Sequence, residues 1–75
     1  MKDMYEIDIA IEPIAEDVLI TGNNLLALKG CILPVVKSIC ETIEYKGDSV
    51  YLITNISKDG EYFDHDEDEI ILSEI

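Results

Sequence analysis

The sequence contains no arginine and no tryptophan, and it has a single histidine. Five lysines stand against seventeen acidic residues, so the formal net charge is −12. A protein that binds nucleic acid directly needs a basic surface to neutralise phosphates, and this chain cannot form one. Its charge instead favours a basic protein as partner, because opposite electric fields steer association.

Long hydrophobic runs are also missing. The longest, residues 31–36 (CILPVV), is far shorter than the roughly 20 apolar residues of a membrane span. The first ten residues, MKDMYEIDIA, alternate with acids and lack the apolar stretch of a signal peptide. We therefore expect a cytoplasmic protein. Its 75 residues correspond to one small domain, residues 1–75.

Catalytic motifs are missing as well. The sequence has no glycine-rich phosphate-binding motif, and His65 lies among acids that favour its protonated form. Cys31 and Cys40 are nine residues apart, so on one continuous helix their thiols would face opposite ways. In a cytoplasmic protein such thiols act as small structural residues. We predict that the chain is not an enzyme and binds no cofactor.

The aspartates of the C-terminal acidic run need separate consideration as metal ligands. Asp64, Asp66 and Asp68 have the spacing of the first half of an EF-hand calcium loop. That loop requires glycine at its sixth position and glutamate at its twelfth, where this chain has Glu69 and Ile75. The prediction is therefore a charged surface with no metal site.

The clearest strand signal lies near the N-terminus. Residues 4–13 (MYEIDIAIEP) alternate between apolar and polar side chains, which is the period of a half-buried strand, and Pro13 ends it. The next segment, residues 14–22, suits either a helical turn or an extended chain. We favour a short strand over residues 18–21 (VLIT).

A helix is predicted over about residues 23–38, where polar capping residues precede strong helix formers. Gly30 could end a first short helix and Pro34 could begin a second. The segment is thus either two short helices or one kinked helix. Because it is almost wholly apolar, we expect it to pack on a sheet.

Two turns are predicted after the helix. Strands over residues 39–45 and 49–56 would flank a turn at residues 46–48. The dipeptide Asp59-Gly60 is a strong hairpin signal.

A short strand over residues 61–63 would follow, then the acidic run 64–69 as a loop, and a last strand within residues 70–75. The predicted fold class is α+β: a small antiparallel sheet of about four or five strands, with one kinked or broken helix packed on one face.

The acidic residues suggest a binding surface. Acids at every second residue of a strand lie about 6.7 Å apart in a rigid row, which can imitate the phosphates of DNA. The predicted partner-binding residues are Glu6, Asp8, Glu12, Glu61, Asp64, Asp66, Glu67, Asp68 and Glu69. Each also has a simpler interpretation as a solvated charge that protects a sheet edge.

Residues 64–74 (DHDEDEIILSE), together with the small size and acidity of the chain, resemble the small phage-encoded anti-defence proteins. The most similar type is the acidic anti-CRISPR protein that mimics DNA at the protospacer-adjacent-motif site of a Cas effector. The resemblance implies an inhibitor that acts in the host cytoplasm on a basic, nucleic-acid-handling protein.

The alternative is a small interaction subunit whose charge serves solubility. The apolar runs 31–36 and 70–72 could then dock on a partner or form a homodimer. Salt distinguishes the two interpretations, because DNA mimicry weakens steeply with ionic strength and apolar docking does not.

Overall fold

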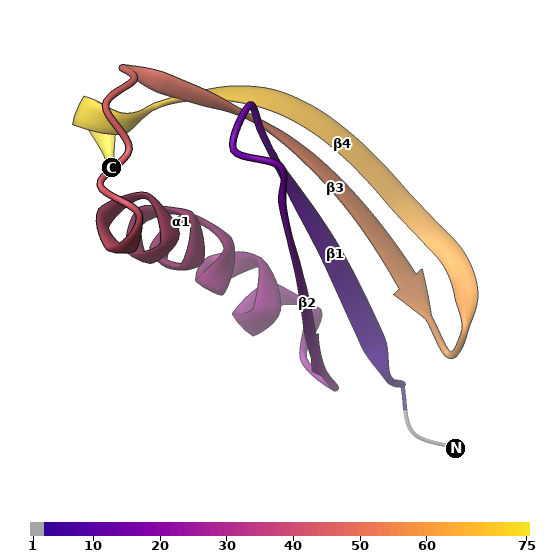
Figure 1. Ribbon diagram of the computed structural model, residues 1–75. Coiled ribbons are helices and arrows are strands. Elements are labelled where there is room, and N and C mark those ends of the chain that lie inside the picture. Colours follow the sequence, from indigo (N-terminus) through magenta and orange to yellow (C-terminus); the bar gives the residue numbers. More distant parts are fainter. Residues whose placement is uncertain (1–2) are drawn as a thin grey trace.

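The protein is a four-stranded antiparallel sheet with one helix on one of its faces (Figure 1). This computed structural model describes residues 3–75. The α+β fold class predicted from the sequence is confirmed. In chain order the elements are β1 (Tyr5–Glu12), β2 (Glu16–Gly22), α1 (Leu25–Thr42), β3 (Ser49–Lys58), β4 (Glu61–Ile71) and a 3-10 turn, η1 (Leu72–Glu74).

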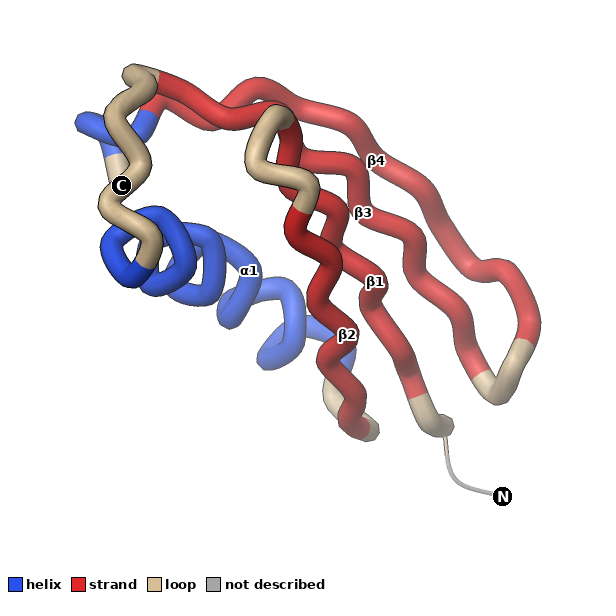
Figure 2. Tube along the Cα trace, viewed as in Figure 1, coloured by secondary structure: helices blue, strands red, loops and turns tan. Residues whose placement is uncertain are grey.

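The strand order in the sheet is β2-β1-β3-β4, and every neighbouring pair is antiparallel. One β-hairpin precedes the helix and another follows it, and their first strands, β1 and β3, pair in the middle (Figure 2). The strands β2 and β4 are therefore the sheet edges. The C-terminus returns to lie beside the end of α1.

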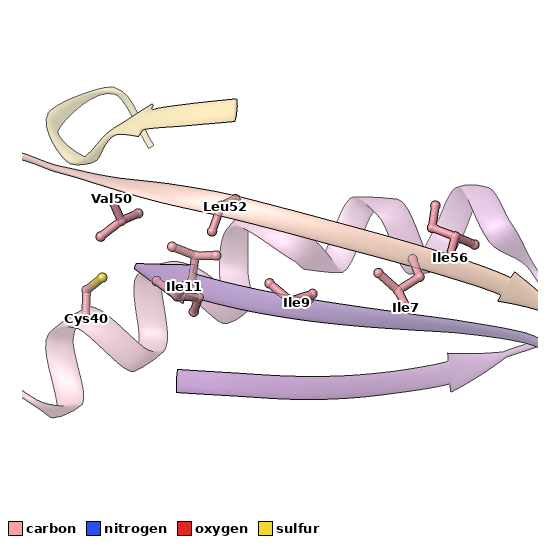
Figure 3. Packing of buried hydrophobic residues seen from close by; sticks show 8 residues of the cluster. Ile7, Ile9, Ile11, Cys40, Val50, Leu52 and Ile56 are labelled. Carbon is pink, nitrogen blue, oxygen red and sulfur yellow. The ribbon is translucent and has the colours of Figure 1, made fainter. Parts of the chain in front are cut away.

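The core is built on the alternating sequence of β1. Ile7, Ile9 and Ile11 are completely buried and point towards the helix (Figure 3). Val36 and Cys40 of α1 are buried in the same cluster. From β3 come Val50, Leu52 and Ile56. Burying one such side chain contributes about 1.5–3 kcal/mol, so three isoleucines on one strand anchor the fold.

The helix α1 is one continuous element. Asn24 caps its start by accepting a hydrogen bond from the Ala27 N–H at 3.2 Å. Both Gly30 and Pro34 lie inside it, so of the two alternatives left open by the sequence the single helix holds and two short helices do not form. An internal proline costs a helix about 3 kcal/mol. Packing of the apolar face against the sheet offsets that cost.

The helix also extends further than predicted. It ends at Thr42, so the predicted strand over residues 39–45 was wrong. Val36 and Cys40 are the buried residues of the helix and lie four residues apart. This spacing fits the period of a helix better than that of a strand. Residues 46–48 connect the helix to β3.

The acidic run is a strand, which corrects the predicted loop over residues 64–69. The hairpin at Asp59-Gly60 is confirmed, and both residues have positive φ angles of 53° and 85°. From there β4 runs without interruption to Ile71, and a 3-10 turn replaces the rest of the predicted last strand. Pairing along the whole of β3 overrides the low strand propensity of Asp and Glu.

The predicted short strand at residues 18–21 lies within β2, which is longer at both ends. Within residues 3–75, no helix is long and apolar enough to cross a membrane.

Gly30 provides a test of the continuous helix. A Cβ atom added there would meet no heavy atom within 4 Å. We expect Gly30→Ala to stabilise the protein by about 0.5–1 kcal/mol in chemical denaturation, because alanine loses less backbone entropy in a helix. Gly60→Ala is the control and should destabilise, since Gly60 has φ +85°. A helix broken at Gly30 would reverse the first result.

Candidate protein-binding surface

The sheet has one face that no helix covers, which we call the open face. Residues paired across antiparallel strands share a face, so the register assigns the side chains. The acids of the open face come from three strands: Glu6, Asp8 and Glu12 of β1, Asp17 of β2, and Glu67 and Glu69 of β4.

No lysine lies on the open face within residues 3–75. Lys29 and Lys37 belong to α1, and Lys46 lies in the connection after it. Lys58, at the end of β3, is on the helix side, where its Nζ lies 3.7 Å from the Asp3 carboxylate and 5.7 Å from the centre of the Tyr5 ring. Apart from His65, the charged side chains named on the open face are therefore acids.

The structure places eight of the nine acids predicted from the sequence on two opposite sides of the sheet and the ninth, Glu61, beside a turn. On the open face are Glu6, Asp8, Glu12, Glu67 and Glu69. On the helix side of β4 are Asp64, Asp66 and Asp68, which pair with inward-facing residues of β3. Glu61 pairs with Lys58 beside the hairpin turn. A single continuous surface of all nine does not form.

Polar side chains of β3 hold the carboxylates of its neighbours. The Tyr51 hydroxyl donates to Glu67 Oε1 at 2.7 Å, and the Ser49 hydroxyl donates to Glu69 Oε2 at 3.0 Å. On the other side, the Ser57 hydroxyl donates to Glu6 Oε1 at 3.3 Å. The central strand thus orients acids on both flanking strands.

His65 extends this network. Its Nε2 lies 2.8 Å from Glu67 Oε2, and its Nδ1 lies 2.7 Å from Asn55 Oδ1. Hydrogen bonds from Tyr51 and then His65 lower the pKa of the Glu67 carboxyl, so that it stays ionised. The same hydrogen bond to Glu67, followed by burial and by nearby acids, raises the pKa of Tyr51.

Asp8 and Asp17 form a pair of like charges at the β1–β2 end of the open face. A hydrogen bond with Asp17, partial burial and the charge of Asp17 raise the pKa of the Asp8 carboxyl. Among the ion pairs of residues 3–75, none joins a cation to this pair. A cationic group brought by a ligand would relieve the repulsion.

Large apolar side chains accompany the acids. Leu19 is 60% exposed and Tyr62 is 75% exposed, and both border one shallow pocket with Glu6 and Asp8. Exposed tyrosine and leucine among acids resemble the composition of a protein-binding surface, where aromatic residues act as anchors.

Sequence reasoning missed Asp17 and the supporting side chains of β3. Asp17 reaches Asp8 only through the β1–β2 register, which the sequence does not reveal. The period-2 pattern of residues 49–57 did carry a signal, because it places Ser49, Tyr51, Asn55 and Ser57 on one side of a strand.

Two further features lie away from the open face. A cavity of about 600 Å³ lies at the end of α1 and is lined in part by Cys40. Burial raises the pKa of the Cys40 thiol, and His65 lies on the open face, away from it. Asp64, Asp66 and Asp68 are alternate residues of one β-strand, which cannot wrap around an ion as a loop does. No group of potential metal ligands forms within residues 3–75.

In comparisons with known proteins, no protein-family model, no curated protein and no solved structure matches the chain. Its function is therefore argued from its own residues.

The Asp8–Asp17 pair gives a testable pH dependence. Because the pKa of Asp8 is raised, the folded protein binds this proton more tightly than the unfolded chain does. The resulting stabilisation is complete below the usual aspartate range and is lost as the pH rises through the raised pKa. We expect Asp17→Asn to lower the pKa of Asp8 towards its ordinary value in a carboxyl-carbon NMR titration, because the substitution removes the charge of Asp17 and leaves the burial of Asp8 in place.

The control is Glu12→Gln, which removes one negative charge from the same face of the sheet. It should leave the pKa of Asp8 unaltered. An Asp8 that titrates at the same pH in the wild type and in Asp17→Asn would contradict the proximity of the pair.

Proposed function

We propose that the protein is an inhibitor that works by binding, and that its open face occupies the basic cleft of a nucleic-acid-handling protein. The observation that carries this proposal is the segregation of charge. Acids from three strands gather on the open face, whereas the lysines of residues 3–75 lie elsewhere. Acids also lie on the helix side, among them Asp64, Asp66 and Asp68, but Lys58 and the helix lysines lie there too, so the open face is the side that carries acids without lysine.

The spacing of the acids supports imitation of nucleic acid. Neighbouring open-face positions on one strand are about 6.7 Å apart. If the rows on β1 and β4 were fully acidic, they would together present about one charge per 3.4 Å, the linear density of one DNA strand. Both rows approach this pattern, with Glu6 and Asp8 on one strand and Glu67 and Glu69 on the other.

The hydrogen bonds from β3 support tight binding. Carboxylates already oriented by Tyr51, Ser49 and Ser57 lose less conformational freedom when a partner binds. The Asp8–Asp17 pair is a position where a lysine or arginine of the partner would be favoured. Leu19 and Tyr62 would add apolar contacts with the partner, because both side chains are exposed beside the acids.

The resemblance to acidic anti-CRISPR proteins fits this proposal. Under it the chain has no catalytic role and needs no cofactor, and its partner is a basic effector in the cytoplasm of the host of a phage. The proposed contact residues are those of the open face, which keeps Glu6, Asp8, Glu12, Glu67 and Glu69 from the sequence prediction and adds Asp17.

A second candidate function is an interaction subunit that docks through apolar surface. The observation in its favour is the exposed apolar surface of α1, where Leu26 is 82% exposed and Leu33 is 41% exposed. Cys31 and Pro34, from the apolar run 31–36, are exposed on the same helix. Such a surface would bury against a partner or a second copy.

Affinity capture with the tagged protein from cell lysate tests the proposal. We expect a basic, nucleic-acid-binding protein to be retained at about 0.1 M salt, released at about 0.5 M, and displaced by duplex DNA, because screening shortens the reach of exposed charges. Neutralising the open face should abolish capture. The variant carries Glu6→Gln, Asp8→Asn, Asp17→Asn, Glu67→Gln and Glu69→Gln.

The matched control is Asp64→Asn, Asp66→Asn, Asp68→Asn, which neutralises the opposite side of β4 and should still capture the partner. A partner that stays bound at about 0.5 M salt, or that the open-face variant also captures, would favour apolar docking instead.

A further inference from the structure

A groove runs along the other side of the sheet, between α1 and β4. Two adjoining hollows of about 250 and 330 Å³ form it, and both are lined by Lys29, Ile32, Thr54 and Asp66. It exists because α1 packs mainly against β1 and β2 and leaves the inner side of the β4 edge uncovered (Figure 1).

The two walls of the groove differ in character. The β4 wall is a row of exposed aspartates, Asp64, Asp66 and Asp68, followed by Ile70. The α1 wall is apolar apart from Lys29, with Ile32 and the 41%-exposed Leu33. Leu26, one heptad before Leu33, continues the same helix stripe and is 82% exposed.

Within residues 3–75, no ion pair joins a cation to the aspartate row. The ion pairs found in residues 3–75 involve Lys58 with Asp3 and His65 with Glu67, and neither includes this row. An occupant of the groove must therefore supply positive charge to one wall and apolar side chains to the other.

We propose that this groove binds an amphipathic helix of a protein partner, with lysine or arginine towards Asp64, Asp66 and Asp68 and leucine-like side chains towards Leu33 and Leu26. A helix suits the groove because its apolar and basic stripes can lie side by side and meet both walls at once. An extended chain alternates its side chains between opposite directions and would turn half of them away.

The spacing of the aspartates along β4 agrees with the spacing of every fourth residue along a helix. Three alternate residues of a strand span about 13.4 Å, and residues i, i+4 and i+8 of a helix span about 12 Å. Long basic side chains accommodate the difference of about 1.4 Å. A basic residue at every fourth position therefore matches the aspartate row.

A second copy of this chain is a poor occupant. Each copy carries a net charge of −12, and its own helix offers only Lys29 and Lys37. Charge complementarity thus selects a basic partner. This inference does not depend on the function proposed for the open face, which lies on the opposite side of the sheet.

The test uses a synthetic helical peptide of about 16 residues, long enough to form a helix, with leucines on one stripe and lysines at every fourth position beside it. A peptide of the same composition in shuffled order is the control. Titration into ¹⁵N-labelled protein should shift amide signals of Ile32, Leu33 and Asp66 and leave those of Leu19 and Tyr62 on the open face unchanged.

Variants then locate the contact. Asp64→Asn, Asp66→Asn, Asp68→Asn should weaken peptide binding about tenfold through the loss of three exposed charge pairs. Glu12→Gln, Glu67→Gln, Glu69→Gln removes the same charge from the open face and should change binding less than about twofold. Unchanged amide spectra of the free variants exclude unfolding.

Four outcomes would overturn the proposal: equal loss in both variants, equal binding of the shuffled peptide, no binding at about millimolar peptide, or a dimer in sedimentation that the aspartate variant abolishes. The aspartate variant is expected to keep open-face capture and to lose peptide binding, so failure of one proposal is distinguishable from failure of the other.

Discussion

A single helix must cover a four-stranded sheet, and the rest of the structure depends on that constraint. The helix is about 10 Å wide, whereas four strands spaced about 4.8 Å apart are nearly twice as wide. The helix covers the alternating isoleucines of β1 and the inward-facing side chains of β3, which are therefore buried. The other face remains in water, and it carries acids from three strands together with exposed apolar side chains such as Leu19.

The same constraint explains how the acidic side chains are arranged on the two sides of the sheet. On the open face, hydroxyl groups of the central strand β3 orient carboxylates of β1 and β4, and no lysine is near enough to neutralise them. On the helix side, the aspartates of β4 border a groove that the helix fails to fill. An acidic edge also resists pairing with other chains. Alternation within one strand thus creates two acidic surfaces of different character.

Local patterns predicted part of this structure from the sequence. The alternation of residues 4–13 defined β1 and its buried face, and Asp59-Gly60 defined the hairpin. The end of α1 and the strand character of residues 64–69 could not be predicted, because both depend on partners. Cys40 extends the helix by packing on the sheet, and the acids become a strand by pairing with β3. The sequence showed which acids could form the binding surface. Only the pairing register of the strands showed on which face of the sheet each acid lies.

The register of β4 against β3 is therefore the central claim, since a slip of one residue would exchange the two acidic rows. Cross-strand nuclear Overhauser effects measure it directly. The account predicts contacts that join Tyr51 to Glu69, Ile53 to Glu67 and Asn55 to His65. Contacts that join Ile53 to Asp66 or Asp68 instead, or no cross-strand contacts over residues 64–69, would contradict it.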